Sequence, residues 1–262
     1  MVNPGMKIDV ILTPRLLPPR FEDTICVVID VLRATTTIVT ALAHGASEVR
    51  PCLTAAEARR YAASGGNTPF LLGGERRGLR IPGFHLGNSP IEYLDSGKIS
   101  GRVIYFSTTN GTPALRRAYR GSARPVYLGA LVNLSAVSTA MVRAAVSDAI
   151  KRIFLICAGR HGEPSLEDWY CAGLLVPRLL SGLVECGIVP ELSDATISAA
   201  EYASMNRGKP LAVLAASEHG RYLKSIGFAA DLEYASQIDK YHLVPLFDGN
   251  RITSAESQPY RG

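Results

Sequence analysis

The sequence repeats one pattern along most of its length, and this pattern limits the folds that the chain can adopt. A short apolar run is followed by a loop of small or polar residues and then by a helix-like stretch. Three of the apolar runs are ICVVID (25–30), VIYF (103–106) and RIFLIC (152–157). Their nearly continuous hydrophobicity is typical of strands that are buried on both faces of a sheet. Because strands that alternate with helices favour a parallel arrangement, we predict an α/β fold with a mostly parallel sheet and helices on both faces.

Domain organisation follows from the length and from two segments that interrupt the pattern. A chain of 262 residues can form one large α/β domain or two small ones, and no clear linker is visible in it. We predict one catalytic α/β unit over residues 1–262, and leave open two α/β subdomains that share a cleft, with a seam near residue 100. The stretch 73–93 is rich in glycine and proline, which predicts a long ordered loop with a functional role. From Ser217 onward we expect a helix, a short loop and a closing strand.

The composition excludes several classes of protein. With 47% hydrophobic and 19% charged residues, the chain is typical of globular enzymes rather than disordered proteins. We expect a cytoplasmic protein without a membrane partner, since no apolar run approaches the roughly 18 residues of a spanning helix and the N-terminus lacks a signal-peptide pattern. Although the net charge is +5, no basic run with interleaved aromatics indicates nucleic acid. Arginine matches phosphate or sulfonate oxygens in pairs, so a small anionic substrate is the expected partner.

Polar residues gather where the predicted strands end. In open parallel sheets, ligands bind beyond the carboxyl ends of the strands. These residues are Asp30, Arg33 and Thr35–Thr37 after the first run, Gly74, Glu75 and Arg76 after residues 70–73, Ser107 to Gly111 after residues 103–106, and Arg160, His161, Glu163, Glu167 and Asp168 after residues 152–157. Each group has a simple structural explanation, because Asp and Thr cap helices and acids favour the first helical turn. Their joint position nevertheless predicts one shared site.

This mixture of residues indicates phosphoryl chemistry. Helix N-termini with glycine and threonine present backbone N–H groups to phosphate oxygens. Carboxylates at strand ends are hard oxygen ligands, which suit Mg²⁺ rather than zinc. Arginines can stabilise the charge that develops on a phosphoryl group in the transition state. We therefore predict phosphoryl transfer or hydrolysis with Mg²⁺ as the cofactor.

Six separated motifs, in order, also resemble the 2-phosphosulfolactate phosphatase family. They are DVLRATTT, GGERRG with GFHLGNSP, STTNGT, GALVN, CAG followed by LEDWYCAG, and SEHGRYLKSIGFAADLEYASQID, over roughly residues 5–247. The resemblance implies an α/β fold and a Mg²⁺-dependent phosphatase. It also implies hydrolysis of (R)-2-phospho-3-sulfolactate to 3-sulfolactate and phosphate, a step in coenzyme M biosynthesis.

The motifs of the family carry over to individual residues of this chain. They imply metal-associated acids at Asp30, Glu75 and Asp168, with Glu167 as the alternate for the last, and catalytic roles for Asp30, Arg33 and Asp168. Phosphate would be held by Arg33, Thr36, Thr37, Thr108, Asn110 and Gly111, and the sulfonate or carboxylate would be read by Arg76, Asn88, Ser89 and Arg160.

Two mechanisms are compatible with these assignments. Asp30 could attack phosphorus and form an aspartyl-phosphate, or it could bind Mg²⁺ while an oriented water attacks. We favour the second because the local DxDx(T/V) pattern of phosphoaspartate enzymes is absent. His161 and His85 are candidate general acids, although a loop or surface position explains each of them more simply. His219 and His242 are assigned no role.

The sequence is also compatible with other functions. The substrate could be another small phosphorylated acid, or the chain could be a non-catalytic sensor of a phosphorylated or sulfonated metabolite. A nucleotide-dependent kinase is less favoured, since neither GxxxxGK[ST] nor a strand followed by GxGxxG occurs. A homodimer is expected only because two-fold dimers are the commonest assemblies.

Overall fold

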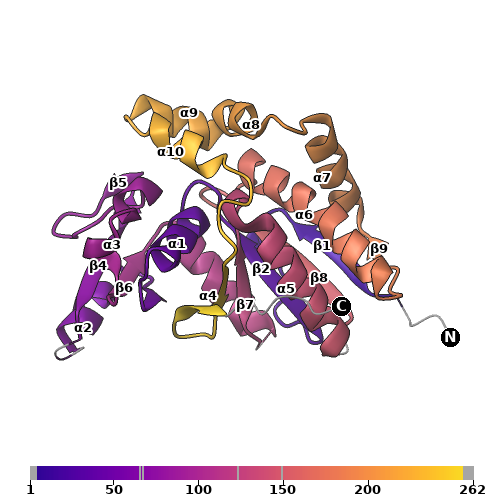
Figure 1. The fold of residues 1–262 in the computed structure, drawn as a ribbon, viewed down its shortest axis with the longest axis horizontal. Coiled ribbons are helices and arrows are strands. Elements are labelled where there is room, and N and C mark those ends of the chain that lie inside the picture. Colours follow the sequence, from indigo (N-terminus) through magenta and orange to yellow (C-terminus); the bar gives the residue numbers. More distant parts are fainter. Residues whose placement is uncertain (1–4, 65, 67, 123, 149, 256–262) are drawn as a thin grey trace.

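A computed structural model describes residues 5–64, 66, 68–122, 124–148 and 150–255. It shows one broad mixed sheet with helices packed against it (Figure 1). The strands are β1 (Lys7–Ile11), β2 (Thr24–Ile29), β3 (Glu48–Pro51), β4 (Phe70–Arg76), β5 (Leu79–Arg80), β6 (Val103–Ser107), β7 (Val126–Gly129), β8 (Arg152–Cys157), β9 (Glu191–Leu192), β10 (Val244–Phe247) and β11 (Ile252–Ala255). The helices are η1 (Pro14–Leu16), α1 (Ala34–Ala43), α2 (Ala55–Ser64), η2 (Pro90–Tyr93), α3 (Ser96–Ile99), α4 (Gly111–Ser122), η3 (Leu131–Asn133), α5 (Leu134–Ser147), α6 (Leu166–Glu185), α7 (Asp194–Met205), α8 (Pro210–Ala216), α9 (Glu218–Ser225) and α10 (Ala229–Ala235).

The sheet consists of two parallel groups joined by an antiparallel hairpin. The strand order is β5-β4-β6-β3-β11-β10-β7-β2-β8-β1-β9. Strands β4, β6 and β3 pair in parallel, as do β7, β2, β8, β1 and β9. The hairpin β10–β11 pairs antiparallel with β7 on one side and with β3 on the other. The predicted α/β fold with a mostly parallel sheet is therefore confirmed, while a subdomain seam near residue 100 stays a prediction.

Side chains of β2 show that both faces of the sheet are covered. All six residues of this strand are buried. Ile25, Val27 and Ile29 belong to one hydrophobic core, which includes residues of α5 and α6. Cys26 and Val28 belong to a second core, which includes residues of α1 and α4. Because successive side chains of a strand point to opposite faces, the near-continuous hydrophobicity of β2 is explained by helices on both sides.

The C-terminal part differs from the sequence prediction. In place of one helix and one closing strand, it forms α9, α10 and the hairpin β10–β11. Helix α9 ends before Gly227, whose φ of +91° is a left-handed conformation that glycine adopts without steric cost. Helices α8, α9 and α10 lie together along one side of the sheet, above α1 and β5 in the view of Figure 1. Within the described residues, the helices are all too short or too polar to cross a lipid bilayer.

Candidate active site

A cavity of about 270 Å³ lies beyond the ends of β2, β4, β6 and β8. Its walls come from the loops that follow these strands and from α9. Six of its polar residues are Asp30, Glu75, Thr108, Asn110, Arg160 and His219. The ends of these four strands therefore meet at one cavity, as expected for a parallel α/β sheet.

Asp30 lies at the wall of this cavity with only 5% of its surface exposed. Its Oδ1 accepts a hydrogen bond from the Ala34 amide at 3.2 Å. The Thr35 hydroxyl bonds the backbone N–H and C=O of Asp30, which fixes the turn between β2 and α1. Burial raises the pKa of Asp30 to about 6; His219 acts in the opposite direction, and the carboxylates of Glu75 and Glu167 add to the increase. Burial is thus the main cause of the raised pKa of Asp30, and the neighbouring acids are opposed by His219 and the Ala34 amide.

Stability in the absence of divalent cations is expected to fall as the pH rises through this pKa. Since the folded-state pKa of Asp30 lies above its ordinary value of 3.8, the uncharged form stabilises the fold at low pH. The difference corresponds to about 3 kcal/mol of unfolding free energy, lost between about pH 4 and pH 7. Urea unfolding of the wild type and Asp30→Asn in EDTA measures this loss as a pH-dependent gap between the two. Parallel pH profiles of the two proteins would contradict the assignment.

Gly111 is packed directly against Asp30. A Cβ atom at this glycine would lie 2.6 Å from Ala34 Cβ and 2.7 Å from Asp30 Oδ2. Both distances are well below van der Waals contact, so a larger residue must displace α1 or the carboxylate. The glycine predicted to contact phosphate therefore also allows α4 to begin beside Asp30.

Gly111→Ala is expected to lower the unfolding free energy by about 1–3 kcal/mol, as overpacking does elsewhere. We also expect kcat to fall by about 10-fold or more, because a shift of Asp30 misplaces it relative to the substrate. The matched control is Gly97→Ala at an exposed position of α3, which should change neither quantity greatly. Thermal unfolding and steady-state kinetics provide both values, and wild-type kinetics in Gly111→Ala would refute the packing argument.

Glu75 and Asp168 each bind two backbone amides. Glu75 Oε1 accepts from the Thr109 amide at 2.8 Å, and its Oε2 accepts from the Gly78 amide at 2.9 Å. Asp168 Oδ1 accepts from the Val31 amide at 2.8 Å, and its Oδ2 accepts from the Gly159 amide at 3.1 Å. Glu75 thus connects the turn after β4 to the loop after β6, and Asp168 connects the loops after β2 and β8.

The environment of Asp168 also perturbs its ionisation. Burial raises its pKa well above the ordinary value, and the charges of Glu167 and Asp30 add to the increase. Two acids of α6 and the acid that follows β2 therefore influence the ionisation of one another.

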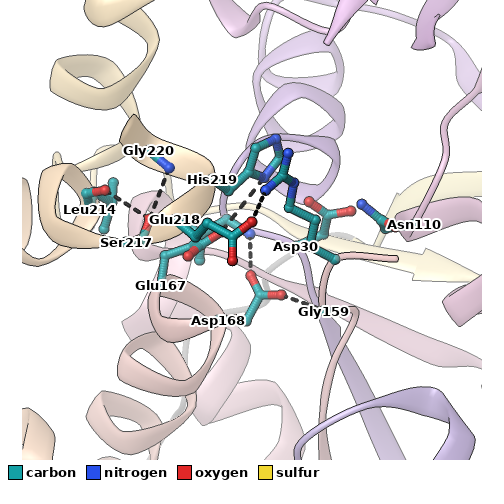
Figure 2. Close-up of polar contacts among 12 residues, drawn as sticks. Asp30, Asn110, Gly159, Glu167, Asp168, Leu214, Ser217, Glu218, His219 and Gly220 are labelled. Carbon is teal, nitrogen blue, oxygen red and sulfur yellow. Dashed lines mark hydrogen bonds and ion pairs between the residues drawn. The ribbon is translucent and has the colours of Figure 1, made fainter. Parts of the chain in front are cut away.

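His219 of α9 reaches the same group of acids, as Figure 2 shows. Its Nδ1 lies 3.7 Å from Glu167 Oε1. Ser217 caps α9 by accepting from the Gly220 amide at 2.9 Å, which orients the first turn that carries His219. Sequence reasoning assigned no role to this histidine, although the SEHG sequence around it is a recognisable helix start.

Arg33 is buried in an ion pair. Its Nη1 lies 2.7 Å from Asp231 Oδ2, its Nη2 donates to the Gly78 carbonyl at 2.5 Å, and its guanidinium lies 4.4 Å from the centre of the Phe228 ring. It lines the cavity while joining α1 to α10 and to the turn after β4. Its catalytic role stays a prediction.

Three buried polar atoms at this site have no hydrogen-bond partner within the described residues. They are Asn88 Oδ1, Thr109 Oγ1 and Glu167 Oε2. Asn88 and Thr109 line the cavity, and Glu167 contacts the lining residue His219. Because buried polar groups are nearly always paired, their concentration here indicates a site for a polar ligand.

Comparison with known proteins identifies the family of the chain. A family model described as 2-phosphosulpholactate phosphatase matches residues 11–250. The chain belongs to this family. A relative from Symbiobacterium thermophilum, named "Probable 2-phosphosulfolactate phosphatase", is 40% identical over 92% of this chain and 99% of its own length. Relatives with the same name from Carboxydothermus hydrogenoformans and Clostridium beijerinckii are 40% and 34% identical, over 92% and 95% of this chain and 92% and 99% of their own lengths. The resemblance seen in the sequence is therefore confirmed.

Only some of the site residues implied by the phosphosulfolactate phosphatase motifs form the cavity wall, and Gly111, Glu167 and Asp168 are not among the described residues that line it. Asn88, Thr108, Asn110 and Arg160 line the cavity. Four others are not among the described residues that form its wall, because their side chains bond elsewhere: Thr36 to the Val31 carbonyl, Thr37 to the Asn88 carbonyl, Arg76 to Ser107, and Ser89 to Asp231. Direct substrate contact by these four gains no support from the geometry and stays a prediction.

Several lining residues are absent from the set that the family motifs imply, and besides His161 those with polar side chains are Arg77, Thr109, His219 and Tyr222. Of the two candidate general acids, His161 lines the cavity, and its backbone amide donates to Asn110 Oδ1 at 3.1 Å. His85 accepts from the Leu72 amide through Nδ1 at 2.9 Å, away from the cavity. This bond agrees with the simpler structural explanation of His85.

The acids of the phosphosulfolactate phosphatase site suit Mg²⁺ in donor type, but they do not enclose an ion. Within the described ranges, no group of three or more His, Cys, Asp or Glu side chains is arranged to hold a metal. Glu75 and Asp168 already use both carboxylate oxygens on backbone amides. Glu167 Oε2 is buried without a partner, and Asp30 accepts one amide. Asp30 and Glu167 are therefore the acids with most freedom to bind a hard cation.

Proposed function

We propose that this chain is a Mg²⁺-dependent phosphatase that hydrolyses (R)-2-phospho-3-sulfolactate to 3-sulfolactate and phosphate. The observation that carries this proposal is the group of unpartnered buried polar atoms around one small, acid-containing cavity. Such a cavity suits a small polar substrate better than an apolar one. The family and its named relatives support the choice of substrate. On the same grounds we propose a cytoplasmic step of coenzyme M biosynthesis, while a homodimer stays an expectation.

The residues of the site can share the work of binding a phosphate monoester. Mg²⁺, when bound near Asp30 and Glu167, would neutralise phosphate charge that these acids would otherwise repel. Thr109 Oγ1 is a donor without a partner, and Asn110 accepts the His161 amide through Oδ1, which leaves its Nδ2 to donate. Both residues directly precede α4, where the positive end of the helix dipole also favours phosphate.

Hydrolysis requires that a P–O bond forms to the nucleophile while the P–O bond to the alkoxide breaks. In the mechanism that we favour, water attacks phosphorus, loses a proton, and the departing alkoxide gains one. In the alternative, Asp30 attacks and a second water later hydrolyses the aspartyl-phosphate. Ala34 holds Oδ1 of Asp30 while Oδ2 lies beside Gly111, so the carboxylate has a fixed orientation in either case. Trapping of an acyl-phosphate on Asp30 would decide for the second mechanism.

The function is tested by phosphate release from 2-phosphosulfolactate, measured with Mg²⁺ and with EDTA. A panel of small phosphorylated acids, including 2-phospholactate and 2-phosphoglycolate, defines the substrate range. We expect Mg²⁺-dependent turnover with the highest kcat/KM for 2-phosphosulfolactate. A higher kcat/KM for another acid would replace the substrate, whereas ligand binding without any turnover would favour the sensor function.

A further inference from the structure

Two arginines at the cavity are held around one tyrosine of α9. Arg77 follows β4 and Arg160 follows β8. Tyr222 contacts both of them, and all three residues line the cavity. The Tyr222 hydroxyl donates to the Arg77 carbonyl at 2.8 Å. The Arg160 guanidinium lies 4.9 Å from the centre of the Tyr222 ring. A single side chain thus positions cations from the two parallel groups of strands.

Arg77 is available to a ligand. Its side chain is exposed and lines the cavity, and within the described residues its guanidinium forms no ion pair or hydrogen bond. Its φ of +53° is uncommon for a residue with a side chain and usually reflects a local constraint. Together with the bond from Tyr222, this conformation places an uncompensated cation at the cavity.

Arg160 is occupied by a carboxylate that an anionic ligand can replace. Its Nη1 lies 2.5 Å from Glu218 Oε1. The Glu218 side chain is 80% exposed, whereas that of Arg160 is 19% exposed. An ion pair with so exposed a partner contributes little stability, so exchange of Glu218 for a ligand anion costs little. Glu218 therefore occupies the position that an anionic ligand group would take.

We propose that Arg77 and Arg160, positioned by Tyr222, form the subsite for the sulfonate of the substrate, and that Glu218 competes for Arg160 in the free enzyme. This inference rests on the proposed function, and it concerns the part of the substrate that does not react. Sulfonate is a permanent anion with three acceptor oxygens, which suits two guanidinium groups better than one. The reacting phosphate belongs instead near Asp30, where the acids of the cavity gather.

The test compares substrates with and without the sulfonate. For 2-phosphosulfolactate, Arg77→Met and Arg160→Met are each expected to raise KM by about 10- to 100-fold, the usual effect of losing a charged hydrogen bond. We expect kcat to change by less than about 3-fold, because the sulfonate does not react. For 2-phospholactate, which carries a methyl group in place of the sulfonate arm, KM should change by less than about 2-fold. Equal losses on both substrates, or no loss on either, would overturn the subsite.

Two further variants test whether Tyr222 positions Arg77 and whether Glu218 competes with the substrate for Arg160. A third variant controls for the loss of a nearby positive charge. Tyr222→Phe should raise KM for 2-phosphosulfolactate by about 3- to 5-fold, because Arg77 loses its positioning bond. Glu218→Gln should lower the same KM by about 2- to 5-fold, since Arg160 is freed. The control is Arg221→Met on the same helix, which removes a positive charge outside the cavity wall and should leave both substrates unaffected. An increase in KM for Glu218→Gln would contradict the competition.

Direct binding measurements test the sulfonate subsite independently of the proposed reaction. Calorimetric titration with 3-sulfolactate and with lactate measures the contribution of the sulfonate without turnover. Wild type should bind 3-sulfolactate at least about 10-fold more tightly than lactate, and Arg77→Met should remove most of this difference. If no phosphate is released from any substrate while this preference holds, the proposed reaction fails and the subsite stands. Equal binding of the two acids by the wild type would refute the subsite.

Discussion

Asp30→Asn is expected to lower kcat for phosphate release by at least about 1,000-fold. The substitution keeps the shape of the side chain and an oxygen that can accept from the Ala34 amide, but it removes the negative charge. Both favoured and alternative mechanisms need that charge, either to bind the cation or to attack phosphorus. The measurement is phosphate release at saturating 2-phosphosulfolactate and Mg²⁺.

Asp23→Asn is the matched control for this substitution. Asp23 forms a surface ion pair with Lys151 at 2.9 Å, and its φ of +48° is one that asparagine tolerates well. We expect this variant to retain nearly full activity. Circular dichroism should show native folding of both variants. Full activity in Asp30→Asn would remove this residue from the reaction and with it the centre of the proposed site.

Removal of divalent cations is expected to lower the activity by at least about 100-fold, and added Mg²⁺ should restore it. The reason is that Asp30, Glu75 and Glu167 carry negative charge close to the position proposed for phosphate, so a dianion binds only when a cation offsets them. The measurement is turnover after dialysis against EDTA, followed by titration with Mg²⁺. Undiminished turnover in the dialysed protein would exclude Mg²⁺ as the cofactor.

Thermal unfolding gives a second measure of the same cation without any turnover. A ligand that binds the folded state raises its stability in proportion to the logarithm of its concentration. We therefore expect Mg²⁺ to raise the melting temperature of the wild type and to have a smaller effect on Glu167→Gln. Glu185→Gln at the exposed end of α6 serves as the control, because it removes a charge far along the same helix. Identical Mg²⁺ responses in all three proteins would exclude Glu167 as a ligand.

The wall of the cavity was largely predictable because strand ends are visible in the sequence. Asp30 ends one apolar run, and Thr108 and Arg160 follow two others, so these residues lie at one edge of a parallel sheet whatever the order of the strands. The geometry supports this part of the prediction at residue level. The roles within the site were less predictable, since position at an edge does not reveal which backbone amides a carboxylate binds.

Two kinds of residue were missed for physical reasons. Successive side chains of a strand point to opposite faces, so at the end of β4 Glu75 faces the cavity while Arg76 bonds Ser107 on the other side. The next residue, Arg77, lines the cavity and has a positive φ. This backbone conformation could not be predicted from the sequence. His219 and Tyr222 belong to α9, whose position over the sheet depends on tertiary packing and not on any local pattern.

The hairpin β10–β11 also bears on how the protein is made. The other strands of this sheet are synthesised before residues 244–255. Until then, the edges of β3 and β7 that later pair with β11 and β10 have unpaired backbone N–H and C=O groups. Exposed edges of this kind recruit strands from neighbouring molecules, and nascent chains are vulnerable to such aggregation. Residues 244–255 close both edges at once, so the inner edges of β3 and β7 are protected only after this hairpin has been synthesised.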